Sequence, residues 1–186
     1  MSVQDRFRRF GQRMRADARK GSAAIEFAFV APIFFALLMG IFEGAIMFFA
    51  QNVMQNAVTT VGRTLRTGQA TCLTKTGTTC NAMTADDFRT QVCASAGALL
   101  PGCATALVVN STRYTGGFGS GAQTPVTGTG NGFTGGACDV MVVRATYPWR
   151  VVTPGATWFL VNSGADKHLI VTTLAFRNEP YGGAAC

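Results

Sequence analysis

The stretch Gly21-Ser22-Ala23-Ala24-Ile25-Glu26-Phe27 stands at the junction between a basic leader and a long apolar segment. Residues 1–20 carry seven Arg and Lys side chains against two Asp side chains, a net charge of +5. From Phe27 to Phe42 no residue is charged, and only Glu43 interrupts the apolar character before Ala50. A segment of this length can span a bilayer, and the basic flank predicts that its N-terminus stays in the cytoplasm.

Glu26 is the unusual residue of this segment. A carboxylate in a membrane helix costs roughly 2–3 kcal/mol at mid-bilayer and less near an interface, and it usually has a functional partner. An ordinary secretory signal would instead end in a small-x-small cleavage site, which the candidate Phe48-Phe49-Ala50 does not provide. A plain signal anchor remains the competing interpretation of the segment.

The run from Gly21 to Pro32, followed by Gly40-Ile41-Phe42-Glu43-Gly44, resembles the TadE-like family of pseudopilins, or minor pilins, of tight-adherence (Tad or Flp) pilus systems. The resemblance covers about residues 20–66. Phe27 departs from the tyrosine that follows the glutamate in the major pilins of these systems, which favours the minor-pilin branch. Pro32 and Glu43 are the other family positions in the membrane helix.

The family resemblance implies cleavage between Gly21 and Ser22 by a prepilin peptidase. Glu26 would then be the fifth residue of the mature chain and would attract the new Ser22 amine of a neighbouring pilin. The implied partners are other pilins and pseudopilins, the Tad assembly platform and the inner membrane. The implied location is a single pass through the bacterial inner membrane with a periplasmic C-terminal domain, and the extracellular pilus after assembly.

Apolar residues continue at helical intervals beyond the membrane segment, with polar residues opposite them. The same helix is therefore predicted to leave the bilayer and become amphipathic, ending at Arg66. Pro32 lies inside it and either allows a kink or is simply a tolerated membrane-helix proline. The predicted organisation is a leader (1–21), a membrane part of the helix (22–50), its amphipathic continuation (51–66) and a periplasmic domain (67–186).

Six cysteines all follow the membrane helix: Cys72, Cys80, Cys93, Cys103, Cys138 and Cys186. An even number on the oxidising side of a membrane predicts three disulfides, for which 15 connectivities exist. Short loops favour Cys72–Cys80 and Cys93–Cys103, which leaves Cys138–Cys186. A metal site is disfavoured because the chain has no Cys-x2-Cys pair, and its one histidine, His168, is far from every cysteine in sequence.

The outer domain is predicted to contain one short helix and several strands. Thr84 is a suitable N-cap for a helix that runs to about Leu99. Segments rich in Val, Ile, Leu and Thr predict strands at 104–113, 139–147 and 169–177, with a short edge element at 158–161. The glycine-rich segment 115–137 is too poor in apolar side chains to pack as regular structure and is predicted to be a long exposed loop.

These patterns predict an α+β fold: a long N-terminal transmembrane and amphipathic helix carrying a small, disulfide-stapled antiparallel β-sheet domain, as in pilins. We expect no enzyme and no cofactor, since no nucleophile with an orienting base and no P-loop occurs. Nucleic-acid binding is disfavoured because the chain from Ser22 onward carries a net charge of only +2. The predicted function is that of a minor pilin in Tad pilus assembly or at the pilus tip, in support of adhesion. The alternative is an uncleaved, membrane-anchored periplasmic binding or scaffold protein.

Overall fold

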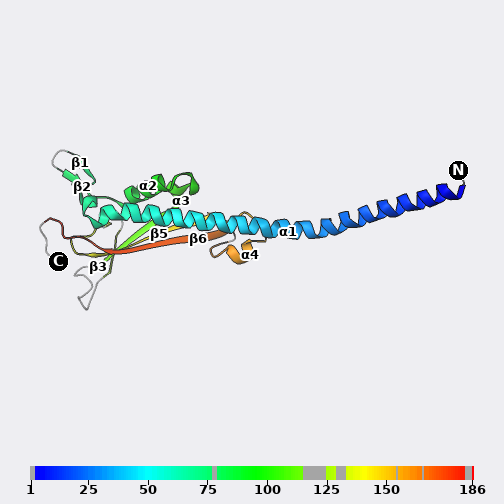
Figure 1. The fold of residues 1–186 in the computed structure, drawn as a ribbon. Coiled ribbons are helices and arrows are strands. Elements are labelled where there is room, and N and C mark those ends of the chain that lie inside the picture. The colour runs from blue at the N-terminus through cyan, green and yellow to red at the C-terminus, as the bar shows by residue number, and fades with distance from the viewer. Residues whose placement is uncertain are drawn as a thin grey trace.

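One helix runs the length of the molecule, and a small sheet lies along its C-terminal half (Figure 1). The computed structural model describes residues 3–76, 79–114, 125–128, 133–153, 155–164, 166–182 and 186. Side chains are described from Ser22 onward, except within 74–80 and 125–128 and at 98. The N-terminal half of the helix projects away from everything else in the chain (Figure 1).

Helix α1 extends from Val3 to Arg66 and is continuous through Pro32. Its predicted end at Arg66 is confirmed, and the reason is Gly68, which adopts a left-handed conformation with φ of 76°. Glycine adopts this conformation at little steric cost and commonly ends helices. A β-carbon at Gly68 would also collide with the ring of Tyr181, so the helix ends where the C-terminal segment crosses it.

Four antiparallel strands form the main sheet in the order β4-β3-β5-β6. Their bounds are β3 Val108–Tyr114, β4 Pro125–Gly128, β5 Val140–Arg150 and β6 Lys167–Arg177. Helices α1 and α2 (Ala85–Ala96) pack on this sheet, α1 mainly against β6 and α2 against β3. The predicted α+β class with a small antiparallel sheet is confirmed.

The remaining elements are short. They are η1 Gln69–Cys72, β1 Thr74–Thr76, β2 Thr79–Asn81, η2 Gly97–Leu99, α3 Cys103–Ala106 and α4 Thr157–Leu160. Strands β1 and β2 form a separate antiparallel hairpin. Because α4 lies in the connection between β5 and β6, it sits at the end of the sheet nearest the projecting half of α1 (Figure 1).

The inner face of the sheet follows from the strand register. Val109 lies opposite Ala145, which in turn lies opposite Thr172, and all three are buried. Directly paired residues share one face of a sheet, so this face is the one covered by the helices. On α1 the buried side chains recur at the predicted helical spacing: Ala50, Met54, Ala57, Val58, Val61 and Leu65.

The N-terminus of α2 confirms the predicted cap. The Thr84 hydroxyl accepts from the Asp87 amide, and the Asp87 carboxylate accepts from the Thr84 amide at 2.9 Å, which is a capping box. Hydrogen bonds from the backbone and side chain of Thr84 lower the pKa of Asp87 below its usual value. The helix ends at Ala96 and continues as the 3-10 turn η2 to Leu99, close to its predicted end.

Two of the three predicted disulfides are present in the described residues, Cys93–Cys103 and Cys138–Cys186. The first joins α2 to α3, and the second ties the C-terminal residue to the start of β5. Cys72 is also disulfide-bonded. The side chain of its predicted partner, Cys80, lies outside the described residues, so that pairing stays a prediction.

Three predictions for the outer domain need correction. The strand predicted at 104–113 begins only at Val108, because Gly102 turns the chain into the short helix α3. The edge element predicted at 158–161 is instead the helical turn α4, which follows a left-handed Gly155 with φ of 82°. Its aromatic side chains face outward without a neighbouring strand, so their β-propensity has no packing to support it.

The third correction concerns the glycine-rich segment 115–137, part of which lies outside the described residues. Its residues 125–128 form β4, which pairs with the edge of β3. Backbone hydrogen bonds make this pairing, so a shortage of apolar side chains does not prevent it. Phe133 from the same segment is fully buried, with its ring centroid 5.2 Å from that of Phe88.

Phe133 provides a test of this correction. Phe133→Ala should lower the free energy of unfolding of the outer domain by about 3–5 kcal/mol, because it leaves a cavity in the core. Urea unfolding of the detergent-solubilised chain measures the change. Arg144→Ala, on the exposed outer face of β5, is the matched control and should change stability by no more than about 0.5 kcal/mol. Equal effects of the two substitutions would show that Phe133 is not part of the core.

Candidate functional site: the projecting helix and its contacts

The projecting half of α1 exposes a continuous apolar surface. The helix Ser22–Arg66 is long and apolar enough to cross a membrane, and none of its most apolar window is buried within the molecule. The exposed large side chains include seven phenylalanines: Phe27, Phe29, Phe34, Phe35, Phe42, Phe48 and Phe49. An exposed apolar patch of this extent marks a surface that contacts a membrane or another protein.

Ser22 and Glu26 lie one helical turn apart at the start of this surface. The Ser22 hydroxyl donates to Oε1 of Glu26 at 3.2 Å, and both residues are exposed. The ion pairs among the described side chains are Arg66–Glu179, Arg89–Asp86 and Arg150–Asp166, so Glu26 takes part in none of them. Its carboxylate is thus left available to a group from another molecule.

Phe27 and Pro32, the other candidate positions of this segment, contribute surface rather than internal contacts. The Phe27 side chain is 68% exposed, and Pro32 is exposed within an unbroken helix. Gly21 lies in the same helix, one residue before Ser22.

Glu43 has a different environment, although it also lies in the apolar segment. Its Oε1 accepts from the Val152 amide at 2.5 Å and its Oε2 from the Thr153 amide at 2.7 Å. The donors lie two and three residues after the end of β5, so the carboxylate fastens the β5–β6 connection to α1. Charge-assisted hydrogen bonds of this kind are stronger than neutral ones. The family resemblance marks Glu43 as a membrane-helix position and does not predict this contact with the β5–β6 connection.

A signal for this role was present in the sequence. Glu43 is the second carboxylate of the apolar segment, and no cationic residue lies within two turns of it on the helix. A carboxylate without a local cation needs hydrogen-bond donors from elsewhere. The sequence did not reveal which segment supplies them.

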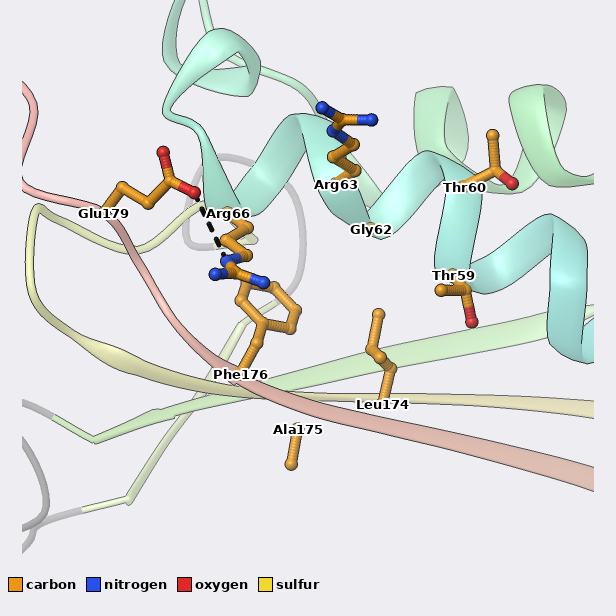
Figure 2. A pocket seen from close by; sticks show the side chains of 9 residues that line it. All are labelled: Thr59, Thr60, Gly62, Arg63, Arg66, Leu174, Ala175, Phe176 and Glu179. Carbon is orange, nitrogen blue, oxygen red and sulfur yellow. Dashed lines mark ion pairs between the residues drawn. The ribbon is translucent and has the colours of Figure 1, made fainter.

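A second contact between α1 and the sheet lies near the end of the helix. Figure 2 shows Leu174 of β6 pointing at α1 beside Gly62, while Phe176 lies beneath Arg66. A β-carbon at Gly62 would collide with the end of the Leu174 side chain, so glycine permits the close approach of helix and strand. The adjacent cavity of about 620 Å³ opens to solvent beside the exposed Arg66–Glu179 ion pair, whose Nε–Oε1 distance is 3.4 Å.

Comparison with known families bears on α1 alone. Residues 21–63 match the family model of TadE-like proteins. This match confirms the family resemblance found in the sequence. It begins at Gly21 and ends within the last turns of α1, so it contains Ser22, Glu26 and Glu43 and leaves out the sheet. No match was found among curated proteins or among solved structures.

The TadE-like segment therefore carries two carboxylates with different surroundings. The chain's own backbone amides donate to Glu43, whereas Glu26 is exposed on a part of the helix that no other described element covers. Only Glu26 has the exposure that an intermolecular contact requires.

Removing the Glu43 carboxylate tests the fastening. Glu43→Ala and Glu43→Gln should both speed hydrogen exchange at the Val152 and Thr153 amides, because neither variant can accept two bonds with a full negative charge. Each lost bond is worth about 1 kcal/mol at a site that solvent reaches. Exchange measured by NMR or mass spectrometry on the detergent-solubilised chain reports the change.

Glu26→Gln is the matched control, since it removes a carboxylate from the same helix without touching the β5–β6 connection. It should leave exchange at both amides unchanged. If exchange in the Glu43 variants equals that of the native chain, the carboxylate does not hold the connection.

Proposed function

We propose that this chain is a TadE-like minor pilin that takes part in the assembly of tight-adherence pili. The observation that carries the proposal is the exposed carboxylate of Glu26, which pairs with no cation among the described side chains. It lies one turn after Ser22, at the start of an exposed apolar helix that matches the TadE-like family. The proposed partners are other pilins and pseudopilins, the Tad assembly platform and a prepilin peptidase. Support of surface adhesion is the expected cellular role.

The proposed topology has α1 crossing the inner membrane once, with the sheet domain in the periplasm. Two independent features support it. Residues 1–20 carry a net charge of +5, which favours a cytoplasmic N-terminus. The disulfides Cys93–Cys103 and Cys138–Cys186 lie in the sheet domain, and such bonds persist in oxidising compartments such as the periplasm.

The proposed mechanism is an intermolecular ion pair within the membrane. Cleavage after Gly21 would create an amine at Ser22, and the Glu26 carboxylate of a neighbouring subunit would pair with it. In a low-dielectric environment a pair of unit charges attracts by several kcal/mol more than in water, before desolvation is counted. An isolated carboxylate is costly there, so the pairing would select subunits and fix their register.

The alternative function is that of an uncleaved, membrane-anchored binding or scaffold protein. The solvent-open cavity between α1 and β6 is the feature that such a protein would use. Its lining mixes apolar and charged side chains without a buried polar group directed into it, so it defines no ligand. The two functions differ in whether the chain is cleaved after Gly21 and whether the Glu26 carboxylate is needed for incorporation into pili.

Processing is the first test. The mature chain should begin at Ser22, and mass spectrometry of the membrane-extracted protein from a strain with its prepilin peptidase identifies the first residue. Gly21→Leu should leave the precursor uncut, because the peptidase must bring the scissile backbone close. A native chain that retains Met1 in the pilus fraction would refute the cleavage proposal.

Assembly is the second test. Glu26→Ala and the isosteric Glu26→Gln should both permit membrane insertion and cleavage, since neither step requires the charge, but should abolish incorporation into sheared pili. Immunoblots of the membrane and pilus fractions measure both steps. Glu179→Gln is the matched control, because it removes an exposed carboxylate from the sheet domain and should leave incorporation intact.

Glu43 is unsuitable as a control here, because it fastens the β5–β6 connection. Incorporation of the Glu26 variants at the native level would favour the anchored binding protein over the minor pilin.

A further inference from the structure

The β5–β6 connection, residues 151–166, forms the end of the sheet domain that faces the projecting half of α1 (Figure 1). The connection is held at its base by backbone hydrogen bonds, Val151 to Asp166 at 2.8 Å and Asn162 to Lys167 at 3.2 Å. Glu43 fastens it to α1 as described above. Its outward side chains therefore have a defined position relative to the helix.

Those outward side chains are large and apolar. Val152 is 78% exposed, Trp158 97% and Phe159 73%, and α4 buries none of its residues. Exposed apolar side chains scattered singly are ordinary, but these three gather at one end of the domain, beside the apolar surface of α1. Trp and Phe in such a position are typical of the interface between a bilayer and water, where Trp is enriched.

The distance along α1 from Ser22 to the level of α4, which forms the tip of the connection, is close to the thickness of the hydrocarbon core of a membrane. A β-carbon at Gly40 would lie 3.9 Å from Cζ of Phe159, so α4 is level with this part of α1. From Ser22 to Gly40 the helix rises about 27 Å. The hydrocarbon core of a bilayer is about 30 Å thick. A helix whose apolar part starts at Ser22 would thus place α4 at the opposite interface.

The backbone amides and charged side chains of the connection also suit a position at the membrane interface. The first two amides after Val151 donate to Glu43, so they are not left without acceptors where water is scarce. Charged side chains occur at the base of the connection, where Arg150 pairs with Asp166 at 3.0 Å. This order, apolar at the tip and charged at the base, follows the change from acyl chains to headgroups.

An apolar cavity of about 450 Å³ lies between α1 and the α4 part of the connection, beside the approach of Phe159 to Gly40. Its lining contains no charged side chain and consists of Ala36, Leu37, Gly40, Ile41, Gly155, Ala156 and Phe159. A space of this character beside a membrane helix suits part of a lipid acyl chain.

We propose that the β5–β6 connection is a second membrane-contact element, in which Trp158 and Phe159 insert into the outer interface of the bilayer beside α1. The occupant of this surface is phospholipid, since the surface continues the apolar surface of α1 at the same depth. The contact would fix the orientation of the sheet domain against the membrane before assembly.

This inference rests on the proposed function, in which α1 crosses the membrane. It also places the end of the membrane segment near Glu43 rather than at the predicted Ala50. Ala50 and Met54 are fully buried against the sheet domain and do not face lipid.

Fluorescence quenching by brominated lipids tests the proposal. Trp149→Phe leaves Trp158 as the single tryptophan of the full chain. The protein is reconstituted in phosphatidylcholine vesicles with bromine near either the headgroup end or the methyl end of the acyl chains. Trp158 should show blue-shifted emission and should lose more fluorescence with the shallow bromine than with the deep one. Comparison of the native chain with Trp158→Phe gives the same quantity without altering Trp149.

A second single-tryptophan chain separates this inference from the proposed function. Phe34→Trp in the Trp149→Phe, Trp158→Phe background reports whether α1 itself lies in the bilayer, and it should be quenched by the deep bromine. Quenching at position 34 without quenching of Trp158 overturns the proposed tip contact alone. No quenching at either position overturns both. Protection of Trp158 from acrylamide without lipid quenching indicates contact with a second copy of the chain and also overturns the lipid contact.

Discussion

The structure depends on one constraint, which is that a single helix must satisfy two different surroundings. Over its C-terminal half, α1 buries an apolar stripe from Ala50 to Leu65 against the sheet. In the segment from Ile25 to Phe42, most large apolar side chains are exposed to whatever surrounds the molecule. The core of the sheet domain needs the C-terminal half of α1, because the buried side chains of that half pack in the same cluster as Phe88, Phe133 and Val143.

The change between the two halves occurs where Glu43 meets the β5–β6 connection. A carboxylate in an apolar segment is costly unless donors reach it, and the amides of Val152 and Thr153 supply them. The same contact limits how far the domain can move along the helix. The projecting length of α1 is therefore a property of the folded domain as well as of its own sequence. In the proposed function, this length determines how the subunit sits in the membrane before assembly.

The sheet domain itself is small and glycine-rich. Disulfides, strand pairing and glycine conformations add to the stability that its core provides. Disulfides Cys93–Cys103 and Cys138–Cys186 staple α2 to α3 and the C-terminus to β5. Such bonds stabilise mainly by restricting the unfolded chain. Strand β4 adds to the sheet edge by antiparallel pairing with β3. Glycines at the ends of elements, such as Gly68, supply conformations that other residues adopt only with strain.

The sequence by itself determined the features that depend on neighbouring residues: the long helix with its end at Arg66, the cap at Thr84, the strand-rich segments and the disulfide Cys93–Cys103. Periodicity, capping and short loop closure act within a few residues, so they can be read along the chain. Only the tertiary structure decided that β4 joins the sheet, that Phe133 enters the core, and that Trp158 is exposed beside α1. It also decided that backbone amides of the β5–β6 connection bind Glu43, whereas the hydrogen bond to Glu26 comes from Ser22 on the same helix. The donors to Glu43 are 109 and 110 residues away and meet it only when the sheet closes on the helix.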